Sequence, residues 1–155
     1  MNIADRIGAL RLESGSSGVE LADELGLTVD GYGELERQDS ELETVLSIAQ
    51  ALKLAKLLGT DLLGLMGEAD PTVKVPISRV RSALAAHLGN SAEAKEILED
   101  QIDWDVGPFL EGSAEWTSVY TLEFLKKLAV AIEVDWPVLV AGLTAIQGVE
   151  ARQGP

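Results

Sequence analysis

The fold is decided by the stretch Ser17-Gly-Val-Glu-Leu-Ala-Asp-Glu-Leu-Gly-Leu-Thr-Val-Asp-Gly-Tyr-Gly-Glu-Leu-Glu36. Ser17 is a preferred helix N-cap, so a helix is expected to begin directly after it. The apolar stripe of that helix consists of Leu21, Ala22 and Leu25. Gly26 then ends the stripe in the position of a C-cap. The first half of the stretch therefore predicts a short amphipathic helix that buries one face.

The second half predicts another short helix after a tight turn. Thr28 is placed to cap it, and Tyr32 and Leu35 supply its apolar positions. A further helix is expected upstream, where apolar residues recur at helical spacing: Ile3, Ile7 and Leu10. Two short helices joined by a glycine turn, with a third helix before them, are typical of a helix-turn-helix unit.

A polar loop at residues 37–40 separates this pair from a long apolar stripe. The stripe runs from Leu42 through Leu58 to Gly59, and it predicts one long helix. Residues 61–66 indicate one last short helix. The first unit is therefore expected to contain five helices and to span residues 1–68.

Residues 69–76 contain two prolines and no helical period, so we interpret them as a linker. A second unit is expected at residues 77–147, followed by a frayed tail at residues 148–155. Its first two helices are expected to carry the apolar residues Val80, Ala83, Leu84, Leu88, Ala94, Ile97 and Leu98. Ser91 is placed to cap the second of these helices.

The second unit is interpreted as a duplicate of the first. Residues 121–134 align without gaps on residues 41–54, at an offset of 80 residues. Four of the aligned positions hold identical residues. Almost every other position that is apolar in one segment is also apolar in the other, which indicates an internal repeat. The chain is therefore expected to be all-α, with two tandem bundles of about five helices each.

This pattern resembles the Xre/Cro-like helix-turn-helix family, which includes the lambda-type repressors. In that family a Ser or Thr caps helix two, a Leu-Ala pair and a later Leu pack it, and Gly with an aliphatic residue makes the turn. The matching residues are Ser17, Leu21, Ala22, Leu25, Gly26, Leu27, Thr28, Tyr32, Leu35 and Glu36, followed by Leu42-Glu43-Thr44-Val45 at the start of helix four. The resemblance covers roughly residues 3–63, and it implies two tandem lambda repressor-like units, the second of them degenerate.

In such repressors the second helix of the pair lies in the major groove, where side chains near its start reach bases and phosphates. The family often places Gln, Arg, Ser, Thr or Lys at these positions, since amides and guanidinium groups read the groove. The matching positions here hold Gly18, Val29, Asp30, Gly31, Gly33 and Glu34. Glycine offers no side chain, and Asp30 and Glu34 would face phosphate with like charge. We therefore expect that the residues needed for the fold are kept and that the residues that would contact DNA are lost.

The formal net charge of −14 also disfavours DNA binding, because binding to a polyanion normally gains affinity from Lys and Arg. Residues 16–38 contain six acids and one base, and residues 91–113 contain seven acids and one base. The basic residues that could still touch phosphates are Arg6, Arg11, Arg37, Arg79, Arg81, Lys126 and Lys127. We interpret them mainly as solvated partners of the surrounding acids.

The third helix of the second unit is interrupted by Gly107-Pro108, and a proline inside a helix costs about 3 kcal/mol. That helix must start late, be broken or be absent. Trp104, Trp116 and Trp136 lie in or beside this region. They either form a protein interface or fill a core that contains few other aromatic residues.

Composition disfavours several classes of function. No Cys is present, which excludes disulfides, thiolate catalysis and Cys-type zinc sites, and the single His87 cannot form a histidine metal site. We expect no cofactor, and no catalytic motif indicates an enzyme. No apolar run approaches the ~20 residues that cross a bilayer, and the start lacks a secretion signal, so a cytoplasmic protein without membrane contact is expected.

The sequence thus predicts a transcription-regulator-like protein that acts by binding another protein, either a regulator or a basic DNA-binding protein. Direct operator binding is the alternative, as a homodimer that gathers its few basic residues onto one face. A third alternative is a structural role in which the two units pack together, partly through the apolar segment 138–146.

Overall fold

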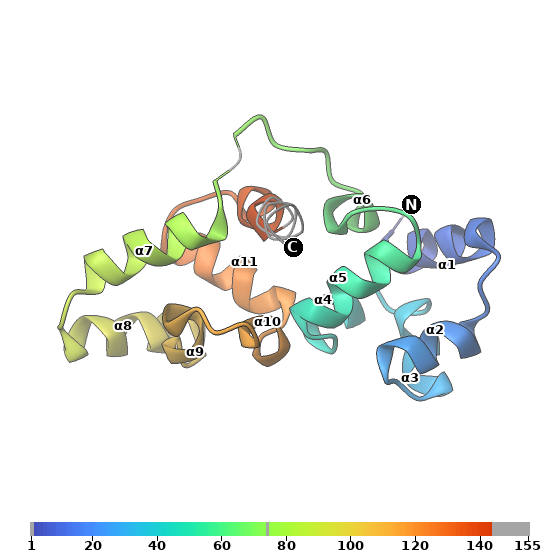
Figure 1. Ribbon diagram of the computed structural model, residues 1–155, viewed down its shortest axis with the longest axis horizontal. Coiled ribbons are helices and arrows are strands. Elements are labelled where there is room, and N and C mark those ends of the chain that lie inside the picture. Colours follow the sequence, from blue (N-terminus) through green and yellow to red (C-terminus); the bar gives the residue numbers. More distant parts are fainter. Residues whose placement is uncertain (1, 74, 144–155) are drawn as a thin grey trace, which may run out of the picture. The chain divides into compact units, whose positions relative to one another are not determined.

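The computed structural model describes residues 2–73 and 75–143. Every regular element in these two ranges is a helix (Figure 1), which confirms the predicted all-α class. Contacts divide the chain into two compact units, the first ending at Ala69 and the second beginning at Asp70. This boundary falls inside the stretch expected to be a linker. The expected tail at residues 148–155, and the expected end of the second unit at residue 147, lie outside the described residues.

The described part of the first unit contains α1 (Ile3–Ser14), α2 (Gly18–Leu25), α3 (Val29–Leu35), α4 (Glu41–Thr44), α5 (Ile48–Leu57) and α6 (Leu62–Met66). The residues expected to cap α2 and α3 do so. The Ser17 hydroxyl accepts a hydrogen bond from the backbone N–H of Glu20. The Thr28 hydroxyl accepts one from the N–H of Gly31. Gly26 follows α2 with φ 72°, the left-handed conformation expected of its C-cap.

The prediction of one long helix after the polar loop is wrong, because α4 and α5 are separate helices. Ser47 begins α5: its hydroxyl accepts from the N–H of Gln50 (3.1 Å), and the Gln50 side-chain oxygen accepts from the N–H of Ser47 (3.0 Å). This reciprocal capping box stabilises a helix start at this point. Leu42 and Leu46 are both buried, so the apolar period continues across the break and conceals it in the sequence. The described part of the first unit therefore holds six helices instead of five.

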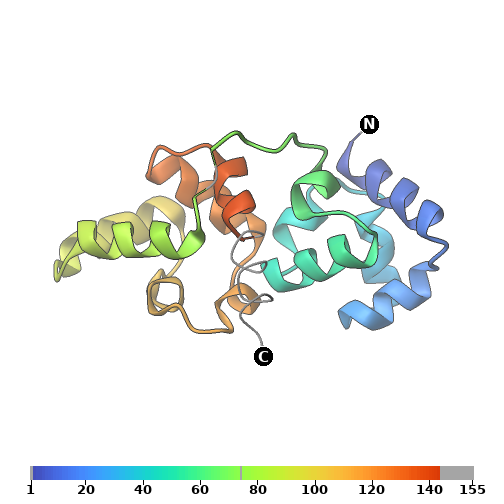
Figure 2. The same ribbon diagram turned by 45° about the horizontal axis from the view of Figure 1, so that its top comes forward.

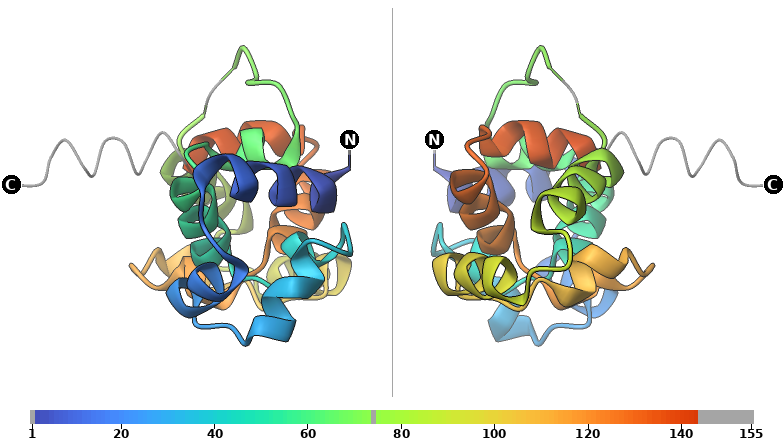
Figure 3. Two further views of the ribbon diagram at one scale, coloured as in Figure 1. Left: turned by 90° about the vertical axis from the view of Figure 1, so that its right-hand side faces the viewer. Right: turned by 90° about the vertical axis from the view of Figure 1, so that its left-hand side faces the viewer.

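The core of the first unit contains a single aromatic ring among its described residues, that of Tyr32. α2 packs against α3 and α5, and α1 packs against α6. The Gln50 side-chain amide also donates to the carbonyl oxygen of Leu25 (3.0 Å), which ties α5 to the end of α2. The left view of Figure 3 shows α2 and α3 together below α1. Packing on α5 thus fixes which faces of the α2–α3 pair point outward.

The described part of the second unit contains α7 (Ile77–Leu88), α8 (Ala92–Ile102), α9 (Gly107–Glu111), α10 (Trp116–Val119) and α11 (Leu122–Ala131), and residues 136–143 are also helical. Ser91 caps α8 as expected, since its hydroxyl accepts from the N–H of Ala94 (3.1 Å). Pro108 lies in the first turn of α9, where its missing N–H costs no helical hydrogen bond. Of the three outcomes expected for this helix, the late start is the one observed.

Three pairs of helices in the two units begin 74 residues apart, α4 and α10 begin 75 residues apart, and only the late-starting α9 departs clearly, at 78 residues from α3. α1 and α7 begin at residues 3 and 77, and α5 and α11 begin at residues 48 and 122. Gly59 and Glu133, which follow the latter two helices, both have positive φ (76° and 59°). The expected offset of 80 residues is therefore wrong. An offset of 80 residues aligns the start of α11 with α4, and it therefore ignores the helix break at Ser47.

The core of the second unit is aromatic. The rings of Tyr120 and Phe124 stack with centroids 3.9 Å apart, and Phe109 meets Trp116 edge to face at 5.2 Å. Trp104 meets Phe124 edge to face at 5.9 Å. Helix α8 packs against α11, whereas α9 packs against α7 and α10. The second unit therefore does not repeat the close pairing of its second and third helices.

The chain enters the second unit beside the helix of residues 136–143 (Figure 2). A Cβ at Gly142 would collide with the backbone carbonyl oxygen of Val75, so only glycine permits this close approach. Leu139, Val140 and Leu143 on the same helix are buried. The entry segment and the last described helix are thus packed together.

Candidate functional site

The outward face of α3 is the surface that the sequence singles out. Val29 is 55% exposed, and Asp30 beside it is also exposed. Gly31 and Gly33 add no side chain to this face. Glu34 supplies a second carboxylate one turn after Asp30. Within α3, therefore, the solvent meets one apolar side chain and two acids, and no base.

Glu34 holds the nearest cation at the end of α3. Arg37 Nη2 donates to Glu34 Oε1 at 2.6 Å, and Gln38 Nε2 donates to Glu34 Oε2 at 2.7 Å. The hydrogen bond from Arg37, together with its charge, lowers the pKa of Glu34. Arg37 remains 61% exposed, so this surface pair is weak and easily rearranged.

Gly18, at the start of α2, is placed differently from the α3 positions. A Cβ at Gly18 would lie 3.6 Å from the ring of Tyr32, which is ordinary van der Waals contact. Position 18 therefore faces α3, and it has space for a small side chain. A long reading side chain at this position would have to pass the Tyr32 ring.

Arg11 forms an ion pair inside the first unit. Its Nε lies 2.7 Å from Glu36 Oε2, its Nη2 donates to Glu36 Oε1 at 3.1 Å, and both side chains are about four-fifths covered. Burial alone would raise the pKa of Glu36, but hydrogen bonding to Arg11 and the charge of Arg11 lower it overall. This two-pronged pair joins α1 to the end of α3. The buried hydroxyl of Tyr32 lies beside the pair without a hydrogen bond of good geometry.

Arg6 is also engaged, because its Nε donates to the backbone carbonyl oxygen of Gly64 and so ties α1 to α6. Arg81 is half-buried in the second unit. Its Nε donates to the carbonyl oxygen of Phe109 (2.6 Å), and its guanidinium lies over the rings of Phe109 and Trp116. Burial lowers the pKa of Arg81. Both arginines therefore hold helices together instead of forming a positive surface.

The two lysines of α11 contact aromatic rings. Lys126 Nζ lies 4.4 Å from the ring centroid of Trp136, and Lys127 Nζ lies 5.6 Å from that of Trp104. Lys127 also lies near the carboxylates of Asp103 and Glu123, at 3.8 and 3.5 Å. Arg79 differs from the other six candidates, since it is exposed and has no ion-pair partner among the described residues. The structure thus gathers no basic strip beside α3 or α9.

The three tryptophans do not form one exposed cluster. Trp116 is buried at 6% exposure against Phe109. Trp104 is partly buried against Phe124, and Trp136 is partly buried under Lys126. The interpretation of these residues as core is confirmed for Trp116, and Trp104 and Trp136 lie at the edge of the core.

Polar contacts hold the start of α9. The Tyr120 hydroxyl accepts from the N–H of Phe109 (3.1 Å) and donates to the carbonyl oxygen of Asp105 (2.6 Å). Glu99 Oε2 accepts from the N–H of Val106 (2.9 Å), and Asp105 Oδ1 accepts from the N–H of Gly107 (2.8 Å). Several acids of this region therefore serve the fold.

An apolar groove with a volume of about 810 Å³ lies in the second unit. One wall is α7, the other is α8, and the floor is the end of α11 with the residues after it. The apolar lining residues are Val75, Val80, Ala83, Leu84, Leu88, Ala94, Ile97, Leu98, Ala131, Ile132 and Val134, and the polar ones are Arg79, His87, Gln101 and Glu133. Its volume lies within the range of natural binding clefts.

Sequence reasoning missed this groove because the stripes on α7 and α8 look like ordinary core faces. Leu84, Leu88 and Leu98 are indeed buried, at 6–8% exposure. Ile97 is 60% exposed, although it belongs to the same stripe. A signal was present in the sequence: α8 carries Ala94 and Ile97, whereas the equivalent α2 positions, 74 residues earlier, are Glu20 and Asp23.

Comparisons with protein-family models, curated proteins and solved structures found no match to this chain. Residues 2–73 and 75–143 include no helix with the length and apolar composition needed to cross a bilayer. In those same ranges, no three acidic or histidine side chains are arranged to hold a metal ion.

Proposed function

We propose that this chain is a regulatory protein of Xre/Cro-like ancestry, whose helix-turn-helix units bind another protein instead of reading operator DNA. The observation that carries the proposal is the outward face of α3, which presents Val29, Asp30 and Glu34 and no base. A reading helix needs hydrogen-bond donors for base edges and cations for phosphates. This face offers neither.

The electrostatics of the flanking residues support the same proposal. Affinity for duplex DNA comes largely from Lys and Arg that displace condensed counterions. In the first unit, Arg11 is committed to Glu36, and Arg37 is paired with Glu34. Contacting a phosphate with either arginine would break an ion pair and leave its carboxylate near the polyanion.

The net charge of −14 favours a basic partner, such as a DNA-binding protein or a positively charged regulator. Opposite charge accelerates encounter and disfavours acidic competitors. We place the protein in the cytoplasm. Neither catalysis nor a cofactor forms part of the proposal.

Operator binding is the second candidate function, and one observation favours it. The α2–α3 pair has the two caps and the intervening glycine turn of a DNA-reading pair. In a homodimer, the exposed Arg79 of each copy would add to the cations available for phosphate.

Fluorescence anisotropy with a labelled mixed-sequence duplex at about 50 mM salt separates the two functions, because phosphate-driven binding is strongest there. The wild-type chain is expected to show no binding at micromolar concentration. The double variant Asp30→Lys/Glu34→Lys is the matched positive control, since it replaces the two acids on the outward face of α3 with bases. It is expected to gain salt-sensitive binding. Micromolar, salt-sensitive binding by the wild-type chain would contradict the proposal.

Affinity capture from the native cell extract then addresses the partner itself. The expected result is a retained protein whose recovery falls as salt increases, as for an acidic surface that binds a basic one. Recovery should be unchanged after nuclease treatment. A partner that is lost on nuclease treatment would indicate that DNA bridges the two proteins.

A further inference from the structure

The groove between α7 and α8 has the form of a site for a helix. Figure 1 shows α7 and α8 spreading apart from the turn that joins them. The lining residues of α7 extend from Arg79 to Leu88, which corresponds to about 14 Å of helix. An apolar trough of this length, with two helical walls, matches the mode in which an amphipathic helix inserts one face into a groove.

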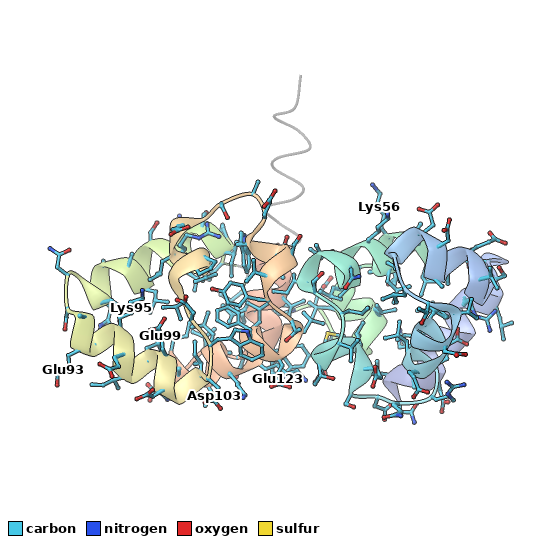
Figure 4. All side chains as sticks on the ribbon, turned by 90° about the horizontal axis from the view of Figure 1, so that it is seen from below. Lys56, Glu93, Lys95, Glu99, Asp103 and Glu123 are labelled. Atoms are coloured by element: carbon cyan, nitrogen blue, oxygen red, sulfur yellow. The ribbon has the colours of Figure 1, made fainter. Side chains whose placement is uncertain are left out.

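The two long faces of α8 are not equivalent. Figure 4 shows Lys95, Glu99 and Asp103 following one another along this helix. Glu99 accepts a hydrogen bond from Val106, and Asp103 lies 3.8 Å from Lys127, so this face is used inside the unit. The groove face has no such partner, and Ile97 there is 60% exposed.

The comparison with α2 shows that the apolar groove face is particular to the second unit. The α2 residues at the positions of Ala94, Ile97 and Leu98 are Glu20, Asp23 and Glu24. All three acids are exposed, as expected for a helix face in water. In α8, Leu98 is buried and Ala94 is half-buried, but Ile97 remains exposed, so an apolar side chain meets solvent where α2 presents Asp23.

Charge identifies the chemistry of that partner. Glu93, Glu96 and Asp100 are exposed on α8, next to the groove wall. Opposite them, the polar side chains that α7 contributes to the rim are Arg79 and His87. A helix with Lys or Arg along one border of its apolar stripe would pair these bases with the acids of α8. A second copy of this chain fits poorly, because each copy carries a net charge of −14.

We propose that the α7–α8 groove binds a basic amphipathic helix of a partner protein, with the apolar stripe between α7 and α8 and the basic border against Glu93, Glu96 and Asp100. This inference rests on the proposed function, because it names the surface through which protein binding occurs. The two proposals fail separately. Duplex binding by the wild-type chain would contradict the proposed function, whereas the experiment below tests the groove alone.

The probe is a synthetic peptide of about 14 residues with Leu at positions i, i+3, i+4 and i+7 and Lys elsewhere, since this pattern gives one apolar stripe. Two matched peptides serve as controls. One has the same composition in an order that places no two Leu on one face, and the other has Glu in place of Lys. Calorimetry with the full chain is expected to give micromolar binding for the first peptide, and binding weaker by about tenfold or more for both controls.

Variants of exposed residues then place the peptide on the groove. Ile97→Ser is expected to weaken binding of the Leu/Lys peptide by about tenfold without unfolding the chain, because Ile97 is largely exposed. Val119→Ser is the matched control: Val119 is 56% exposed in the same unit and does not line the groove. The triple variant Glu93→Gln/Glu96→Gln/Asp100→Asn is expected to weaken the Lys peptide and to strengthen the Glu peptide.

Several results would overturn the inference. Equal binding of the reordered peptide would mean that the acidic chain attracts lysines without using the groove. Unchanged affinity in Ile97→Ser would place the peptide elsewhere. Self-association seen by light scattering and lost in Ile97→Ser would assign the groove to a second copy. Anionic or neutral lipid vesicles that bind the chain and are released by Ile97→Ser would assign it to a lipid surface.

Discussion

Leu35 in the first unit and Phe109 in the second lie 74 residues apart and are both buried, although Leu35 ends α3 and Phe109 lies in the first turn of α9. The same replacement recurs nearby, and the aromatic cluster Phe109, Trp116, Tyr120 and Phe124 occupies the positions of Leu35, Leu42, Leu46 and Gln50. One series of equivalent positions is thus filled by aliphatic and polar side chains in one unit and by rings in the other. The two units keep the same order of helices despite this exchange, but their helices pack differently.

The difference in packing has consequences for the second and third helices of each unit. In the first unit, Gln50 caps α5 and also holds the end of α2, so α2 lies against both α3 and α5. In the second unit, Phe124 replaces Gln50 and the capping box is lost. Helix α8 packs on α11 and no longer pairs closely with α9. The groove beside α7 accompanies this rearrangement.

The largest effect is expected from removing a ring of the second unit. Phe109→Ala should cost about 3–5 kcal/mol of unfolding free energy, through lost burial and a cavity. All three tryptophans lie in the second unit, so urea unfolding followed by tryptophan fluorescence reports this unit selectively. Leu35→Ala is the matched change in the first unit, where about 2–5 kcal/mol is expected and circular dichroism must be used. A loss below about 1 kcal/mol in Phe109→Ala would contradict the ring cluster as the core.

The second effect concerns the Arg11–Glu36 ion pair of the first unit, whose two equivalent positions in the second unit are uncharged. Glu36→Gln should cost about 1.5–3 kcal/mol at neutral pH, because the hydrogen bonds from Arg11 are charge-assisted. The positions of Arg11 and Glu36 in the second unit are Ala85 and Leu110.

The pH dependence of the first unit follows from the lowered pKa of Glu36. Its stabilisation is fully present above the unfolded pKa of about 4.3, and it is lost as the pH falls through the lower pKa of the folded state. Unfolding measured between neutral pH and about pH 3 should therefore show a difference between wild type and Glu36→Gln that shrinks on acidification. A difference that stays constant over this range would show that the carboxylate charge is unimportant.

The third effect compares the two tyrosines. Tyr120→Phe should cost about 1–3 kcal/mol, because it leaves the buried N–H of Phe109 and the carbonyl oxygen of Asp105 without their partner. Tyr32→Phe removes a buried hydroxyl that makes no hydrogen bond of good geometry, so it should be neutral or slightly stabilising. Equilibrium denaturation of both variants measures the contrast. Equal losses in the two variants would show that the Tyr32 hydroxyl has a partner.

The smallest effect should be the same in both units. Ser17→Ala and Ser91→Ala each remove the side-chain cap of a second helix, at a cost of about 1 kcal/mol. Gly replacements at the same positions should cost only a few tenths of a kcal/mol. Thermal unfolding resolves these values, and a cost confined to one unit would contradict a shared helix plan.

Much of the helix plan could be predicted from local signals. Ser17, Thr28 and Ser91 can be identified as caps because their hydroxyl groups precede apolar stripes, and each accepts the expected backbone hydrogen bond. The break at Ser47 could not be recognised by periodicity, since Leu42 and Leu46 keep the apolar spacing on both sides of it. The same concealed break led to the 80-residue offset. Cap-to-cap alignment, Ser17 with Ser91, gives 74 directly.

The candidate site was less accessible to sequence reasoning. The acidic character of α3 could be read directly, because its exposed positions are fixed by its buried ones, Tyr32 and Leu35. The roles of Arg11 and Arg81 could not, since each contacts residues at least 25 positions away. The groove also depends on tertiary packing. Ile97 belongs to a normal helical stripe, and only the position of α8 on α11 leaves it uncovered.

The contact between Gly142 and Val75 allows the groove of the second unit to be adjusted from a position outside its lining. Any larger residue at position 142 must push the backbone of Val75 aside, and Val75 lines one end of the groove. The width of the cleft is therefore governed partly by a residue that does not line it. Evolution, or a protein engineer, can retune the fit of a bound ligand from this position while every wall side chain stays the same.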